Sequence, residues 1–167
     1  MRVLDLGCGK KKLKGALGVD ISKDSDADII ANLNHIPLPF KDNSFDLIHL
    51  DNVLEHLDNL IGVVEEIWRI AKPGARVVIK APWYMSKGAF QDPTHRHFIT
   101  DKTFDYFLPN SEYNFYTKAR FRIKKLKYIW GGGLKIKILR IILGDRLVRE
   151  SIMNAVVGIE FELEVVK

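Results

Sequence analysis

The sequence predicts an α/β fold in which a doubly wound, mostly parallel sheet ends in an antiparallel C-terminal hairpin. A short apolar run, Val3–Leu6, leads directly into the turn Gly7-Cys8-Gly9, which is the pattern of a buried strand followed by a sharp turn. Further apolar runs alternate with turns or helical periodicity up to about residue 81, as in parallel sheets with crossover connections. Two long alternating segments follow, one basic and one acidic, and strands of opposite charge pair favourably.

The composition indicates one globular domain over residues 1–167, in which residues 107–167 form the hairpin with a basic amphipathic insertion. The chain is 47% hydrophobic and 28% charged, which excludes a disordered class. Cys8 is the single cysteine, so an internal disulfide is excluded and a reducing cytoplasm is the expected compartment. The most apolar segment, 134–143, contains three basic residues and is too short to span a bilayer, so we expect no transmembrane segment.

The first half of the chain contains short strands separated by turns. The basic segment Lys10–Gly15 is too short for a full helix and predicts a turn. Pro37 and Pro39 exclude regular structure from the loop that contains them. We expect strands over residues 2–6, 16–20, 28–31, 45–50 and 76–81.

One long amphipathic helix is expected between the last two of these strands. From Asp51 onward, apolar residues recur every three or four positions, as on the buried face of a helix. Pro73 and Gly74 then end this helix. The apolar positions are Val53, Leu54, Leu57, Leu60, Ile61, Val64, Ile67, Trp68 and Ala71.

The second half of the chain has a different pattern. Residues 83–97 are rich in aromatic residues, Gly, Pro and His and have no clear period, and a loop of this length is often functional. A short helix is expected over residues 100–107. Residues 121–130 alternate apolar and basic side chains, and residues 159–166 alternate apolar and acidic ones, which predicts two half-exposed antiparallel strands.

The glycine turn limits the ligands that the sheet could bind. A dinucleotide fingerprint needs a third glycine, where this chain has Lys12, and an acidic residue about 20 positions further on, whereas Asp20 comes earlier. The phosphate-binding P-loop motif is absent. Neither pattern explains Asp5, so a phosphate-bearing nucleotide is not indicated.

The stretch Asp5–Gly9 instead resembles motif I of the class I S-adenosylmethionine-dependent methyltransferases, a family with a Rossmann-like fold that includes the methyltransferase type 11 proteins. Five further segments agree with this family in order and spacing, and the resemblance runs from about residue 2 to residue 107. These segments are Gly18–Ser22, Asn32–Asn34, Pro37–Asp46, Val53–Leu57 and Lys72–Ala75.

The resemblance implies S-adenosylmethionine as the cofactor and assigns roles to individual residues. Asp20 would accept hydrogen bonds from the ribose hydroxyls, and Asn32 would accept one from the adenine amino group. Asp5 would face the ammonium group directly or through water. Asp51 and Asn52 would line the methionine portion. The full expected cofactor set is Asp5, Gly7, Cys8, Gly9, Asp20, Ile21, Asn32, Leu33, Asp51 and Asn52.

Cys8 is expected to be a small buried residue and not a nucleophile, since nothing near it in the sequence would lower its pKa. The basic turn that follows it replaces the helix that the family usually has between the first two strands. We therefore expect an open pocket, or one covered by the loop at residues 83–97 or by a second subunit.

The loop after the fifth strand holds the candidates for the acceptor side, together with Trp83 at its start. Its segment Gln91–Phe98 resembles one found in small-molecule methyltransferases, including those of sugar and polysaccharide pathways. His95 or His97 could be a general base near neutral pH, with Asp92 as a further candidate, and a scaffold role is the alternative for each histidine. These three residues have the ligand types of a metal site, but they crowd one flexible loop, so we expect no metal.

Three functions follow, in decreasing order of support. The first is transfer of a methyl group from S-adenosylmethionine to a small-molecule acceptor. The second is an S-adenosylmethionine-binding protein with little catalysis of its own, or a partner subunit, which Asn32 and the lack of a helix before the first strand favour. The third, RNA methylation, rests on the basic segment 118–149 with Tyr128 and Trp130 as stacking partners, and nucleic acid is the least favoured partner. Residues 134–147 could instead form a homodimer contact or dock on a membrane surface.

Overall fold

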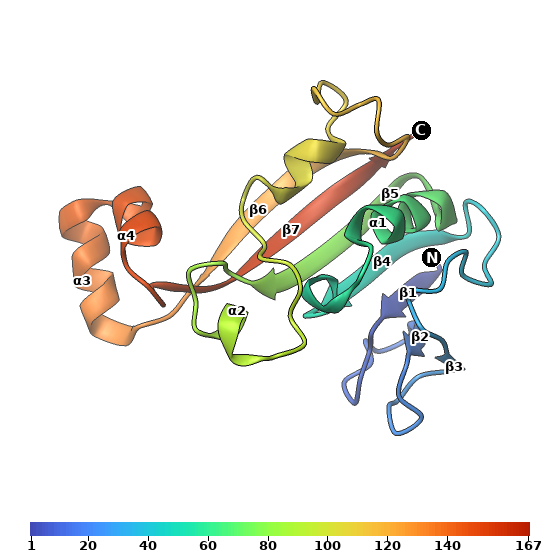
Figure 1. The fold of residues 1–167 in the computed structure, drawn as a ribbon, viewed down its shortest axis with the longest axis horizontal. Coiled ribbons are helices and arrows are strands. Elements are labelled where there is room, and N and C mark those ends of the chain that lie inside the picture. The colour runs from blue at the N-terminus through green and yellow to red at the C-terminus, as the bar shows by residue number, and fades with distance from the viewer.

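The computed structural model describes residues 1–167 as a seven-stranded sheet with helices. The strand order is β3-β2-β1-β4-β5-β7-β6 (Figure 1). β1 to β5 run parallel, and β7 lies antiparallel between β5 and β6. This arrangement confirms the predicted fold class. The strands are β1 Val3–Leu6, β2 Leu17–Asp20, β3 Ile29–Ile30, β4 Phe45–Asp51, β5 Ala71–Pro82, β6 Arg120–Trp130 and β7 Val156–Val166.

The connections among the first four strands contain no helix, as the sequence predicted for Lys10–Gly15. In this connection the side chain of Lys12 packs against the sheet, as a helix would. Its side chain lies over Gly18, where a Cβ would come within 2.5 Å of Lys12 Cδ. Its ammonium group donates to Asp28 at 2.8 Å, and Asp28 also accepts the Gly18 N–H at 2.7 Å. The lysine that occupies the third-glycine position therefore joins the turn to the segment after β2.

The predicted long helix is wrong at its N-terminal end. A short 3-10 helix, η1 Leu54–His56, is followed by Leu57 in an extended conformation, and the regular helix α1 spans Leu60–Ile70. Asn59 caps this helix by accepting the Gly62 N–H at 2.9 Å. The apolar side chains before Leu60 fit the helical period because they are buried, but the cap at Asn59 starts the helix later.

The two faces of the sheet have opposite chemistry. Leu50, Ile79 and Phe161 are register neighbours on one face, and all are at most 1% exposed. This face packs in one core with side chains of α1 and of the 3-10 helix η2, Thr103–Phe107. Lys80, Glu160 and Lys127 are neighbours on the other face. The predicted pairing of a basic with an acidic strand is therefore confirmed, and it produces a charged face.

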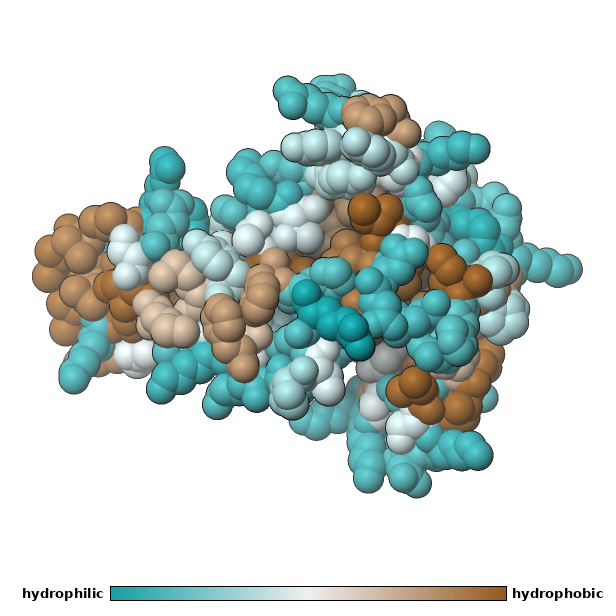
Figure 2. Space-filling view, viewed as in Figure 1, coloured by the Kyte–Doolittle hydropathy of each residue, from teal (hydrophilic) through white to brown (hydrophobic).

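A helical hairpin connects β6 to β7 beyond the end of the sheet (Figure 1). It consists of α3 Gly133–Leu143 and α4 Asp145–Ser151, which share a small core of Ile136, Val148 and Ala155. Several large apolar side chains of α3 are exposed, Ile141 to 85%, and Figure 2 shows apolar surface gathered at this end of the molecule. No helix of the structure combines the length and hydropathy that crossing a bilayer requires.

Candidate functional site

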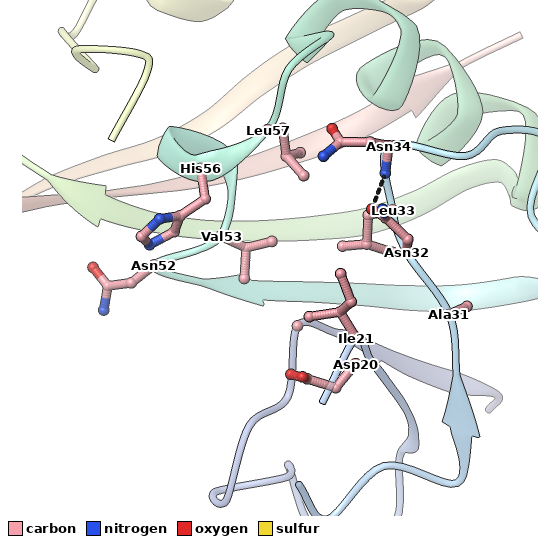
Figure 3. Close-up of a pocket in the computed structure, with 11 residues that line it drawn as sticks. Asp20, Ile21, Ala31, Asn32, Leu33, Asn34, Asn52, Val53, His56 and Leu57 are labelled. Atoms are coloured by element: carbon pink, nitrogen blue, oxygen red, sulfur yellow. Dashed lines mark hydrogen bonds between the residues drawn. The ribbon is translucent and has the colours of Figure 1, made fainter. Parts of the chain in front are cut away.

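A cavity of about 270 Å³ lies where β1, β2, β3 and β4 end. Ligands of open α/β sheets bind at these carboxyl ends. Figure 3 shows its side chains arriving from the end of β2, from the segment after β3 and from the turn after β4. No lysine or arginine lines it. The lining residues are Gly7, Asp20, Ile21, Ala31, Asn32, Leu33, Asn34, Asn52, Val53, His56 and Leu57.

The glycine turn and Asp20 form one wall of this cavity. Gly7 has φ +67°, and a Cβ at this position would lie 2.4 Å from Val53 Cγ2, so both the backbone conformation and the packing require glycine. The Asp20 carboxylate accepts the N–H groups of Gly9 and Ser22, both at 2.8 Å. Each carboxylate oxygen keeps lone-pair capacity for one further donor.

Six of the ten expected cofactor residues line the cavity: Gly7, Asp20, Ile21, Asn32, Leu33 and Asn52. The other four lie near it without lining it. Gly9 contributes through its N–H bond to Asp20. Cys8 is buried, and burial together with the carboxylates of Asp5 and Asp20 raises the pKa of its thiol. This agrees with the prediction that Cys8 is not a nucleophile.

Asp5 is engaged by the protein itself. Its side chain is 3% exposed. One carboxylate oxygen accepts the Leu13 N–H at 2.7 Å, and the other lies 2.8 Å from His49 Nδ1. The residue predicted to face the ammonium group therefore holds the turn after β1 and the neighbouring strand β4.

The other polar candidates divide between the cavity and its surroundings. Asn32 Oδ1 accepts the Asn34 N–H at 2.9 Å, the bond drawn in Figure 3, so Asn32 both shapes a turn and lines the cavity. Asn52 lines it with φ +54°. Asp51 is exposed outside the cavity, 3.4 Å from Lys80 Nζ.

Five lining residues were missing from the predicted set: Ala31, Asn34, Val53, His56 and Leu57. Asn34 and His56 lie in segments that the family motifs cover, so position after a strand could have identified them. Asn34 Oδ1 accepts the Asp58 N–H at 2.8 Å, and this bond joins the segment after β3 to the turn after β4.

A second cavity, of about 500 Å³, adjoins the first and shares Asn34 and His56 with it. Its lining contains charged and polar side chains and a proline but no hydrophobic residue. It lies between the end of η1 and the loop that carries the predicted catalytic candidates. The remaining lining residues are Asp58, Pro93, Thr94, His95 and Arg96.

The three catalytic candidates are held differently. His97 Nε2 lies 2.8 Å from the Leu57 carbonyl, which fixes this histidine against the turn. Asp92 accepts the side-chain and backbone donors of Thr94 at 2.6 and 2.8 Å, and these bonds lower its pKa. His95 Nδ1 faces the Ala89 carbonyl at 3.0 Å, which leaves Nε2 free. Of the three, His95 alone lines the second cavity.

Glu55 completes this region, although it belongs to neither the expected cofactor set nor the catalytic candidates. The side chain is 1% exposed, and neither carboxylate oxygen has a hydrogen-bond partner. Burial raises its pKa to about 7. The rings of His56 and His95 pack edge to face with centroids 4.6 Å apart, and one ligand atom from each of Glu55, His56 and His95 lies within 4.8 Å of the others.

Aromatic residues predicted to bind ligands lie elsewhere. Trp83 is 1% exposed, packs against Tyr84 and Tyr128, and lines neither of the two cavities described above. Arg149 lies over the ring of Tyr128, and Arg140 over that of Trp130. A guanidinium group of the protein therefore already covers one face of each ring.

The comparisons with known proteins agree with the motifs. A family model described as a methyltransferase domain matches residues 4–79. An uncharacterized protein of Methanocaldococcus jannaschii is 39% identical over 90 residues, 46% of this chain and 39% of that protein. A sterol 24-C-methyltransferase of Aspergillus fumigatus is 30% identical over 124 residues, 58% of this chain and 32% of that protein. The chain thus spans well under half the length of these relatives.

The fold is also shared with solved structures. A methyltransferase from Archaeoglobus fulgidus, described as S-adenosylmethionine-dependent, superposes with a TM-score of 0.65 over 98% of this chain and 85% of that one, at 18% identity. Residues 4–79 therefore match a methyltransferase domain, and the chain as a whole shares its fold with solved S-adenosylmethionine-dependent methyltransferases.

Proposed function

We propose that this protein transfers the methyl group of S-adenosylmethionine to a small polar acceptor. The observation that carries this proposal is the junction of two cavities at Asn34 and His56. The first has the position and donor set of a cofactor site, and the second has room for an acceptor next to it. The end of η1, between the two cavities, is where the reacting groups would meet.

The lining of the first cavity fits this cofactor better than a phosphate-bearing one. Asp20 can accept hydroxyl donors, and Ile21, whose side chain is 66% exposed, offers apolar surface for a planar base. The absence of lysine and arginine from the lining leaves phosphates without a counter-charge. Gly7 lets the turn after β1 pack directly against Val53, another lining residue of this cavity.

The bound cofactor would supply an electrophilic methyl group, so the protein's contribution is to orient the acceptor and receive its proton. The second cavity supports a hydroxylated acceptor, because its walls offer Asn34, His56, Thr94 and His95 and, apart from the ring of Pro93, no apolar side chain. A sterol-like acceptor would find no matching surface there. The substrate named for the fungal relative therefore does not fit this cavity.

Calorimetric titration of the full chain with S-adenosylmethionine tests the first step. We expect binding that Asp20→Ala weakens by about 2 kcal/mol, roughly 30-fold in Kd, because a charge-assisted pair of bonds is lost. Asp24→Ala is the matched control, since Asp24 is exposed and outside the cavity. Absence of binding at millimolar cofactor would contradict the proposal, as would equal affinities for Asp20→Ala and wild type.

The second candidate function is cofactor binding with little catalysis. It is supported by the bonds that occupy His97 and Asp92 within the protein and by the use of Asn32 in a turn. Methyl transfer to a panel of polyols, sugars and phenols separates the two functions. Transfer to any of them favours the enzyme, whereas tight cofactor binding without transfer favours the binding protein.

We further propose that the α3–α4 hairpin forms a homodimer contact. Its exposed apolar side chains are Leu134, Ile138, Ile141, Ile142, Leu143 and Leu147, and apolar surface of this kind marks interaction sites. Sedimentation of wild type and of Ile141→Glu/Ile142→Glu tests this. A dimer that the double variant abolishes supports the contact, and a wild-type monomer overturns it.

A further inference from the structure

We propose that Glu55, His56 and His95 bind a divalent transition-metal ion, with Zn²⁺ as the best-matched species, in the wall between the two cavities. Two imidazoles and one carboxylate are a ligand set that Zn²⁺ and related ions favour. The three ligand atoms already lie within 4.8 Å of one another, so small side-chain movements would complete coordination.

The ring of His95 is oriented for a ligand role. A carbonyl oxygen can only accept, so Nδ1 must carry the proton that it shares with the Ala89 oxygen at 3.0 Å. The lone pair is therefore on Nε2. Histidine ligands of metals typically donate their other ring N–H in this way, which fixes the tautomer.

His56 is oriented by a chain of two bonds. Thr94 Oγ1 donates its proton to Asp92 Oδ1 at 2.6 Å, so this hydroxyl must accept from His56 Nδ1 at 2.8 Å. The His56 lone pair is consequently also on Nε2.

Glu55 supplies the observation that calls for a cation. A carboxylate that is 99% buried is normally paired, yet both of its oxygens lack a partner. A ligand atom of each imidazole lies within 4.8 Å of this carboxylate, and no protein group donates to either of its oxygens. A metal ion would satisfy all three acceptors at once, whereas folding alone satisfies none.

The backbone holds the two halves of this site together. The Glu55 carbonyl accepts the N–H groups of Arg96 at 2.7 Å and His97 at 3.2 Å. The loop that carries His95 is thereby fixed to the turn that carries Glu55 and His56. The set first considered for a metal, Asp92 with His95 and His97, is not assembled, because Asp92 bonds Thr94 and His97 bonds the Leu57 carbonyl.

The position suggests a role that rests on the proposed methyl transfer. Three protein ligands leave a coordination position open, and His56 and His95 both line the acceptor cavity. A metal-bound acceptor hydroxyl would lose its proton to solvent more readily. Its oxygen would then bond to the methyl carbon as the carbon–sulfur bond breaks, which yields the methyl ether and S-adenosylhomocysteine.

The test is titration of the chelator-treated full chain with Zn²⁺ alone, and with Co²⁺ for its visible absorption bands. We expect one ion per chain, and affinity at least about tenfold lower in Glu55→Gln and in His95→Ala. His35→Ala is the matched control, since His35 is exposed and outside both cavities, and it should bind as wild type does.

The outcomes separate this inference from the proposed function. No binding at millimolar Zn²⁺, or equal binding by wild type and Glu55→Gln, overturns the metal site even if S-adenosylmethionine binds. Zn²⁺ binding without S-adenosylmethionine binding leaves the metal site standing and removes the methyltransferase role. Methyl transfer at full rate in the metal-free protein would overturn the catalytic role inferred for the metal.

Discussion

Two buried carboxylates, Asp5 and Glu55, lie near the first cavity, and their hydrogen bonding differs. Asp5 has a donor or a histidine nitrogen on each oxygen. Glu55, buried just as deeply, has none. The difference teaches that Asp5, which the family motif assigns to the cofactor, has a structural role in this protein. Glu55, to which the motif assigns no role, is the carboxylate that remains available to bind a ligand.

The surroundings explain the contrast. Asp5 pairs in register with His49 on the neighbouring strand, and the basic turn after β1 returns to place the Leu13 N–H on its second oxygen. Glu55 lies on η1, whose neighbours in the folded chain are two histidines with fixed tautomers. Strand register and the basic turn therefore give Asp5 its partners. Around Glu55, by contrast, the neighbouring groups are hydrogen-bond acceptors.

The largest effect is expected for Asp5→Ala. It leaves the Leu13 N–H and His49 Nδ1, which are both partly buried, without their partner, so the free energy of unfolding should fall by about 3 kcal/mol. Urea denaturation followed by circular dichroism measures this loss. Asp5→Asn, which keeps one acceptor oxygen, should lose less, and the exposed Asp24→Ala should lose almost nothing. A stable Asp5→Ala with weakened cofactor binding would return Asp5 to the ammonium role.

The opposite result is expected for Glu55→Gln in the absence of metal. Burial raises the pKa of Glu55 from 4.5 to about 7. The nearby carboxylates of Asp51 and Asp92 also raise this pKa, whereas His95 lowers it. A raised pKa means that the folded state binds the proton more tightly. Stability from this group is therefore complete below pH 4.5 and is lost as pH rises to about 7.

The consequence is a pH-dependent gain. At pH 8 Glu55→Gln should unfold with up to about 3 kcal/mol more free energy than wild type, because it removes a buried charge. At pH 4 the two proteins should be equal. Thermal denaturation at both values measures the difference, and saturating Zn²⁺ should reverse the order at pH 8. A gain that is the same at both pH values would contradict the burial of an ionised Glu55.

The sequence predicted the parts of this molecule that depend on local pattern. The strands, the basic turn at Lys10–Gly15 and the charged β6–β7 pair all follow from periodicity and composition, and the motif located Asp20 and Gly7. The start of α1 was misplaced because residues 53–57 are buried by tertiary contacts and happen to fit a helical period. The two partners of Asp5 lie 8 and 44 residues away in the sequence, and His95 lies 40 residues from Glu55. No local pattern encodes contacts of this kind.

A smaller effect should follow from Thr94→Val, which tests whether the hydrogen bonds from Asp92 through Thr94 orient His56. Removal of the hydroxyl that orients His56 should weaken Zn²⁺ binding by about tenfold, with little change in unfolding because Thr94 is exposed. Thr94→Ser keeps the hydroxyl and should restore the affinity. Competition with a chromophoric chelator measures both. Equal affinities for the valine and serine variants would show that the Asp92–Thr94–His56 chain does not position the ligand.

The smallest effect is expected on the charged face that also carries Asp5. Arg76 and Glu162 form an ion pair of 3.0 Å there, but their side chains are 59% and 29% exposed. Water and salt screen such a pair, so a double-mutant cycle with Arg76→Ala and Glu162→Ala should give a coupling below about 1 kcal/mol. Unfolding at low and high salt measures it, with a decrease at high salt. A coupling of about 3 kcal/mol, as large as the loss expected for Asp5→Ala, would contradict this reasoning. Solvent exposure would then not explain why the Asp5 contacts are expected to stabilise the protein more than the Arg76–Glu162 pair.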